Sequence, residues 1–130
     1  MSEHYDEIAI KARFWVSEIV DARLSDAFGG DERHAAAVVL AQLVGDVPGG
    51  TGWDSDEASC RLMLAALKLG QGELPRLALW ASAAKEDPRD LIAAAEYARE
   101  LRQEGEKERE ADLGEYLQWV SGGTFFDEAE

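Results

Sequence analysis

Cysteine, basic residues and long apolar runs are scarce in this sequence of 130 residues. The single cysteine, Cys60, excludes an internal disulfide framework and fits a reducing compartment. Only 13 Lys and Arg stand against 27 Asp and Glu, which gives a formal net charge of −14. Because a surface of this charge repels polyanions, we expect no direct binding to nucleic acid or to anionic lipid.

Neither a membrane span nor an export signal is visible in the sequence. The longest apolar run, residues 35–41, is about half as long as a bilayer span requires. Residues 1–7 are acidic where a secretory signal would be basic and then apolar. Hydrophobic residues nevertheless make up 46% of the chain, enough to build a core. We expect a soluble cytoplasmic protein with one domain over residues 1–123 and an acidic aromatic tail over residues 124–130.

The spacing of apolar residues predicts an all-α bundle of about six helices, since no alternating β pattern of useful length occurs. Asp87-Pro88 is the clearest boundary, typical of an N-cap and the first helical position. Residues 35–41 are apolar almost all round, which predicts that their helix lies at the centre of the fold. The predicted helices cover residues 5–24, 31–44, 54–70, 74–84, 87–104 and a last segment that includes residues 113–120.

Residues 58–117 resemble a degenerate tetratricopeptide-type array of helical hairpins. The turn at residues 70–72 predicts the first hairpin, with its two helices antiparallel. The further cues are Gly72 and Gly105, 33 residues apart, Ala78 and Ala111 at the same interval, and Asp87-Pro88 where such repeats often place a proline. The first 57 residues do not join this pattern. The resemblance implies a concave protein-binding surface and no chemistry.

A line of carboxylates and several aromatic residues are the candidate partner-binding groups. The acidic run consists of Glu104, Glu106, Glu108, Glu110, Asp112 and Glu115. On a helix it either docks a basic partner or is simply a solvated face. Trp15 is expected in the core, whereas Phe14, Trp80, Trp119, Phe125 and Phe126 are the candidate aromatic contacts. An apolar stripe of Ile10 and Phe14 could alternatively close a homodimer.

A second interpretation uses carboxylates as ligands of Mg²⁺. Glu96 and Glu100, with Glu108 and Asp112, form two acidic pairs that adjacent helices could bring together, as in all-α nucleotide pyrophosphohydrolases. Those enzymes space each pair three residues apart, whereas both pairs here are four apart. Cys60 is expected to be a small core residue, and no cofactor is predicted.

The sequence therefore favours a small acidic helical binding protein that works by protein–protein contact. An inhibitor, an immunity or antitoxin-like protein, a DNA mimic and a chaperone or adaptor all fit this description, each with a partner that carries a basic surface. The alternative is a Mg²⁺-dependent enzyme of the pyrophosphohydrolase type.

Overall fold

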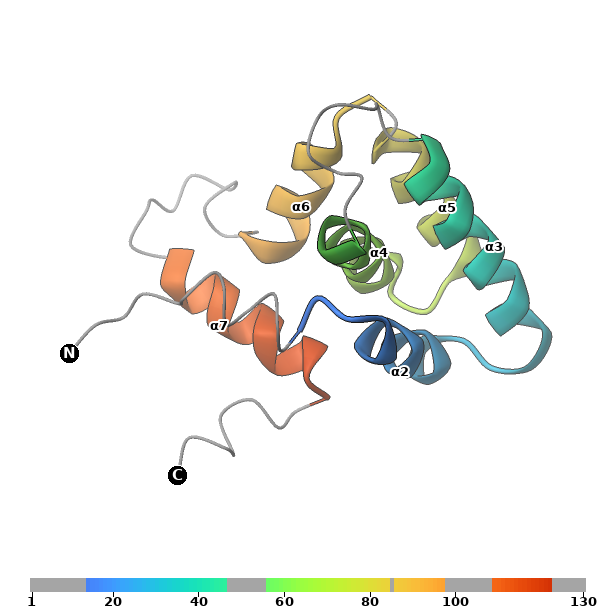
Figure 1. Cartoon of the computed structure of the whole chain (residues 1–130), viewed down its shortest axis with the longest axis horizontal. Helices are drawn as coiled ribbons and strands as arrows, with labels where there is room; N and C mark the ends of the chain where they lie inside the picture. Colours follow the sequence, from blue (N-terminus) through green and yellow to red (C-terminus); the bar gives the residue numbers. More distant parts are fainter. Residues whose placement is uncertain (1–13, 47–55, 85, 98–108, 123–130) are drawn as a thin grey trace.

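The computed structural model describes residues 14–46, 56–84, 86–97 and 109–122 (Figure 1). These residues form an all-α bundle, and no strand occurs among them. The helices are α2 (Ser17–Ala27), α3 (Gly30–Asp46), α4 (Asp56–Gly70), α5 (Leu74–Ala84), α6 (Pro88–Glu96) and α7 (Arg109–Val120). The predicted fold class is confirmed, and the described residues contain six helices, in agreement with the predicted number of about six.

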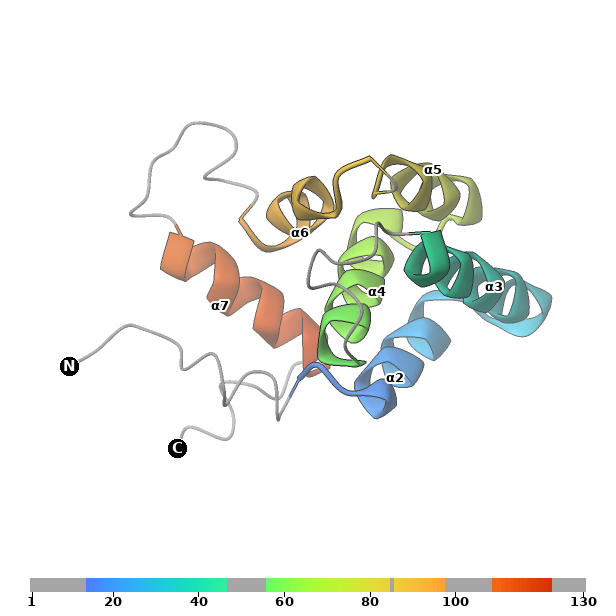
Figure 2. The same ribbon diagram turned by 45° about the horizontal axis from the view of Figure 1, so that its top comes forward.

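Helix α4 is the centre of the bundle. It packs against α2, α3, α5 and α6, and both ribbon views show it surrounded by the other helices (Figures 1 and 2). Leu62, Leu64, Ala65 and Ala66 on this helix are fully buried. The expectation that residues 35–41 form the central helix is wrong, because α3 lies at the edge and leaves Val38 42% exposed.

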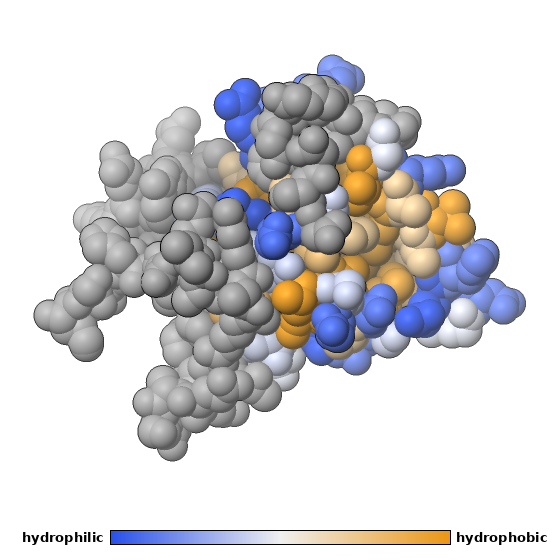
Figure 3. Space-filling view, viewed as in Figure 1, coloured by the Kyte–Doolittle hydropathy of each residue, from blue (hydrophilic) through white to orange (hydrophobic). Residues whose placement is uncertain are grey.

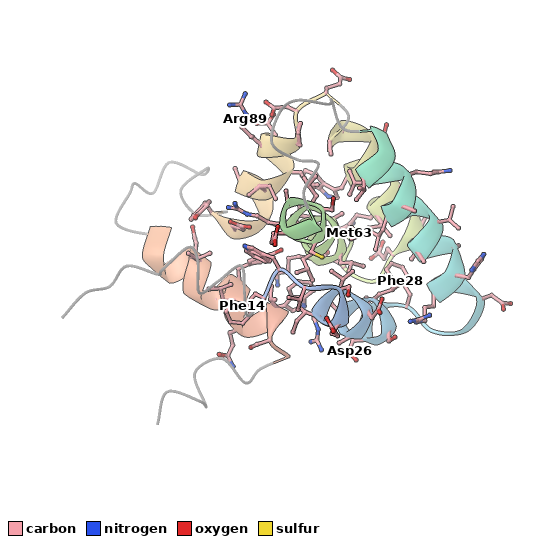
Figure 4. The ribbon with its side chains drawn as sticks, viewed as in Figure 1. Phe14, Asp26, Phe28, Met63 and Arg89 are labelled. Carbon is pink, nitrogen blue, oxygen red and sulfur yellow. The ribbon has the colours of Figure 1, made fainter. Side chains whose placement is uncertain are left out.

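The helix predicted over residues 5–24 is not continuous, because a turn precedes α2. Residues 14–16 form a turn, and Val16 is the extended N-cap of α2, with φ −132° and ψ 153°. Residues 5–13 lie outside the described residues. Apolar spacing reports which side chains are buried, and here Phe14 and Trp15 reach the core from the turn without a helical backbone. Phe14, Phe28 and Met63 are labelled in Figure 4, in the region where α2, α4 and their neighbours meet.

The predicted start of α6 is confirmed, and its predicted end is wrong. The carboxylate of Asp87 accepts a hydrogen bond of 3.0 Å from the backbone N–H of Arg89, which satisfies one free donor of the first turn. The helix ends at Glu96, well before residue 104, because Tyr97 leaves the helical region and donates its N–H to the Ala93 carbonyl. Residues 98–108 lie outside the described residues.

Helices α4 and α5 approach closely at Gly70, across the short turn predicted from the glycines. A Cβ added at Gly70 would lie 3.1 Å from the Cβ and 3.2 Å from the Cα of Leu77. Gln71 and Gly72 then turn the chain in the left-handed region, at φ 53° and 74°. We therefore expect Gly70→Ala to lower the free energy of unfolding by about 1–3 kcal/mol, because the two helices must move apart.

Gly45 is the matched control for this prediction. It also lies in a helix, but a Cβ there meets no atom within 4 Å. Gly45→Ala is expected to leave stability unchanged or raise it by about 0.5 kcal/mol, since alanine loses less backbone entropy on folding. Urea denaturation of the two variants measures the difference, and equal effects would contradict the close approach of α4 and α5.

Candidate functional site

The predicted acidic line does not form one exposed face. Asp112 is 7% exposed and lines a small cavity with Glu96 and Tyr116, so its prediction as an exposed partner contact is wrong. The spacing of acidic residues along α7 does not indicate which side of the helix packs on α6, and Asp112 lies on the side that shares a cavity with Glu96 of α6. Glu115 is exposed, as expected. Outside the described residues lie Glu104, Glu106 and Glu108, and the side chain of Glu110 is likewise not described.

The candidate aromatic contacts separate into three groups. Phe14 is 2% exposed, so its predicted place on a partner surface or a homodimer stripe is wrong. Phe14 lies in the turn that precedes α2, and this turn directs its side chain to the core. Trp80 and Trp119 are half-buried against the core, and Trp15 is buried as predicted. The remaining aromatic candidates, Phe125 and Phe126, lie outside the described residues, as does Ile10 of the predicted homodimer stripe.

Arg61 and Glu96 form a bidentate ion pair between α4 and α6. Arg61 Nε donates to Glu96 Oε2 at 2.9 Å, and Nη2 donates to Oε1 at 2.8 Å. The Glu96 side chain is completely buried, while the Arg61 side chain is 27% exposed. The Arg61 guanidinium also lies 5.7 Å from the centre of the Trp15 ring. Burial acts to lower the pKa of Arg61, but the hydrogen bonds and the charge of Glu96 outweigh it and raise that pKa.

This ion pair bears directly on the Mg²⁺ interpretation. The structure brings Glu96 and Asp112 to the same cavity of about 120 Å³, as two facing helices were expected to do. Both oxygens of Glu96, however, accept hydrogen bonds from Arg61. Glu100 and Glu108 lie outside the described residues, and within the described part no group of three His, Cys, Asp or Glu could hold a metal ion. Arg61 was missed because it is 35 residues from Glu96, with no local pattern to join them.

The hydroxyl of Tyr116 is buried beside this pair and has no hydrogen-bond partner among the described residues. Tyr116 is 2% exposed, and its ring lies 6.5 Å from that of Trp15 and 5.7 Å from that of Trp119. Burial, reinforced by the charge of Glu96, raises the pKa of Tyr116 well above its ordinary value of 10.0, while Arg61 acts in the opposite direction. The folded protein therefore strongly disfavours the tyrosinate.

This raised pKa predicts a loss of stability at alkaline pH. The contribution of Tyr116 is complete below pH 10, where the unfolded tyrosine is neutral, and falls at higher pH because only the unfolded state ionises readily. Tyr116→Phe removes this loss, and it is expected to match or exceed the wild type at neutral pH because an unsatisfied buried hydroxyl costs about 1–3 kcal/mol. The tyrosinate absorbance that the wild type shows and Tyr116→Phe lacks should appear only as the circular dichroism signal is lost. Ionisation of all three tyrosines before unfolding would contradict the burial.

Two large apolar side chains are exposed on neighbouring helices at the edge of the bundle. Leu79 on α5 is 69% exposed and Val38 on α3 is 42% exposed, and the two helices pack against each other. Smaller apolar residues on the same helices are also exposed, namely Ala41, Ala78 and Ala83. We call these five residues the α3–α5 outer surface. Figure 3 shows apolar atoms gathered over α3, with hydrophilic residues at their margin.

Val38 and Leu79 are not among the site residues predicted from the sequence. The available signal was the excess of apolar positions around residues 35–41, which was assigned to complete burial. Within the described residues, no helix combines the length and apolar character needed to cross a bilayer. Comparison with protein-family models, with curated proteins and with solved structures finds no match to this chain.

Proposed function

We propose that this chain is a small acidic binding protein of the cytoplasm that acts by protein–protein contact, with the α3–α5 outer surface as the contact and a basic surface on the partner. The observation that carries the proposal is the exposure of Val38 and Leu79 in a chain with a net charge of −14. Isolated exposed apolar residues are common. Here, however, Val38 lies within residues 35–41 of α3, which are apolar almost all round the helix.

The apolar part of the surface supplies the gain in binding free energy. Removing apolar surface from water contributes about 25 cal/mol per Å², and Leu79 and Val38 retain much of their area for this purpose. Trp80, next to Leu79 in α5, is half-buried against the core. An aromatic residue fixed in this way is a typical anchor of a protein interface, because it loses little side-chain entropy on binding.

Exposed carboxylates on α3 and next to α5, which we call the charged margin, determine the kind of partner. Asp31 and Glu32 are exposed in the first turn of α3, and Glu73 and Glu86 are exposed just before and after α5. These carboxylates attract a basic partner and accelerate association. They oppose pairing of two copies, since each copy brings a net charge of −14. An inhibitor, an immunity or antitoxin-like protein, a DNA mimic and a chaperone would all use such a contact.

A pull-down with the tagged protein from its native host, at low and at high salt, tests this proposal. We expect the wild type to retain a basic protein at low salt and to release most of it at high salt, because screening weakens the charged margin. The variant Val38→Ser, Leu79→Ser is expected to retain little of that protein at either salt concentration. Mass spectrometry identifies the retained protein.

Ala22→Ser is the matched control, because Ala22 is also an exposed apolar residue but lies on α2. It should retain the partner as the wild type does. Retention that is equal in the wild type and in the Val38→Ser, Leu79→Ser variant would overturn the assignment of the surface. Retention of acidic proteins, or of none, would overturn the proposed charge of the partner.

A further inference from the structure

A cleft of about 640 Å³ lies where the C-terminal ends of α2, α4 and α7 meet. It is separate from the α3–α5 outer surface and shares no residue with it. Its volume falls within the range of about 300–1,000 Å³ typical of small-molecule sites. Its polar lining comprises Arg23 and Asp26 of α2, Lys68 of α4, Gln71 of the following turn, and Gln118 and Trp119 of α7.

The guanidinium of Arg23 has more hydrogen-bond donors than the neighbouring groups have acceptors for them. The guanidinium Nη2 pairs with Asp26 Oδ2 at 3.0 Å, and Nη1 donates to the Trp119 carbonyl at 3.5 Å. The Nε–H is buried and finds no acceptor within the described part of the chain. Gly122 leaves room for this guanidinium, since a Cβ there would lie 3.1 Å from both Nη atoms. The position of the guanidinium is therefore fixed, and its donors are only partly used.

Lys68 adds a second cation to the cleft. Its ammonium lies 5.3 Å from the centre of the Trp119 ring, and within the described part of the chain it forms no ion pair. Oε1 of Gln71 already accepts from Arg76 at 2.6 Å, which leaves the donor NH₂ as the remaining polar group of that side chain. With Asp26 as the one carboxylate, the lining carries two cations and one anion in a chain that is strongly acidic overall.

The helix ends account for part of this arrangement. Backbone carbonyls at helix C-termini carry partial negative charge and favour nearby cations, as the contact of Arg23 with the Trp119 carbonyl illustrates. They do not account for the open volume, nor for the Lys68 ammonium, which forms no ion pair within the described residues although carboxylates line a neighbouring cavity with it. An acceptor-rich ligand would complete both features.

We propose that this cleft binds a small ligand through an oxyanion, either a carboxylate or a phosphate group, held by Lys68 and Arg23 next to Trp119. Hydrogen bonds between a cation and an oxyanion are roughly twice as strong as neutral ones, and a guanidinium in a fixed position loses little entropy on binding. The neighbouring indole provides an apolar wall for the rest of the ligand.

Titration of the full chain with inorganic phosphate, citrate and sodium chloride, at one pH and equal ionic strength, tests this site. The readout is the tryptophan fluorescence that the wild type shows and Trp119→Phe lacks. We expect a saturable change with phosphate or citrate and none with chloride, and the tighter of the two identifies the oxyanion. Chloride is needed because general screening stabilises any protein of such high net charge.

Lys68→Gln and Arg89→Gln are matched variants, since each removes one exposed positive charge. Lys68→Gln is expected to weaken binding about tenfold or more, whereas Arg89, which points away from the bundle on α6, should have no effect (Figure 4). Equal affinities of the wild type and Lys68→Gln, or equal responses to chloride and to both oxyanions, would overturn the site. Either result leaves the test at Val38 and Leu79 unaffected.

Discussion

Replacement of Arg61 by alanine is expected to lower the free energy of unfolding by about 3–5 kcal/mol. The variant leaves the carboxylate of Glu96 completely buried and without its bidentate partner. It also removes the guanidinium from the face of Trp15. Urea denaturation followed by circular dichroism measures the loss.

The double variant Arg61→Leu, Glu96→Leu separates the cost of a lone buried charge from the value of the pair. Two apolar side chains leave no charge to solvate, so we expect the double variant to be more stable than Arg61→Ala by several kcal/mol. The free energy gained by the pair is partly offset by the desolvation of both groups, and the double variant measures the remainder. A double variant as unstable as Arg61→Ala would show that packing, rather than charge, dominates at this position.

Arg89→Ala is the control for this prediction, because Arg89 belongs to an exposed pair. Its Nε lies 3.8 Å from Asp87 Oδ1, and the two side chains are 83% and 43% exposed. Exposed pairs contribute about 0–1 kcal/mol, so the change should be small. The cap of α6 is retained, since Asp87 accepts from the backbone of residue 89 and not from its side chain. Equal losses in Arg61→Ala and Arg89→Ala would contradict the buried ion pair.

The helices were predictable because their signals are local. Asp87-Pro88 marks the start of α6 by capping chemistry, and the glycines at 70 and 72 mark the turn between α4 and α5. Boundaries were less predictable where a tertiary contact decided them. Nothing near Tyr97 in the sequence announces that α6 ends there, and apolar spacing gave no sign that α2 starts only at Ser17.

The candidate site was harder to predict, since its features depend on contacts between distant residues. The sequence alone suggests Glu96 as a metal ligand, because its partner Arg61 lies on another helix and is not evident from local spacing. The cleft joins Arg23, Lys68 and Trp119 from three helices, and no spacing in the sequence relates them. An apolar pattern all round a helix is equally compatible with a central helix and with a peripheral helix that presents a contact surface. The sequence pattern therefore identified the unusual helix but assigned it the wrong position.

The positions of α3 and α4 lead to the second large effect, a difference between Leu64→Ala and Val38→Ala. Leu64 is fully buried at the centre of α4, so its truncation leaves a cavity and is expected to lower the free energy of unfolding by about 2–5 kcal/mol. Val38 lies within the apolar run of α3 but is 42% exposed. Val38→Ala is expected to leave stability unchanged or to raise it by about 0.5 kcal/mol, because alanine has the higher helix propensity.

Urea denaturation of both variants, repeated at several protein concentrations, makes this comparison decisive. If α4 is the centre of the bundle, Leu64→Ala must lower the free energy of unfolding strongly and Val38→Ala hardly at all, at every protein concentration. If Val38→Ala were as costly as Leu64→Ala in dilute solution, α3 would be covered within the monomer and the arrangement of the helices would be wrong. If its cost grew with concentration, a second copy would cover Val38, and the proposed heterologous contact at the α3–α5 outer surface would give way to self-association.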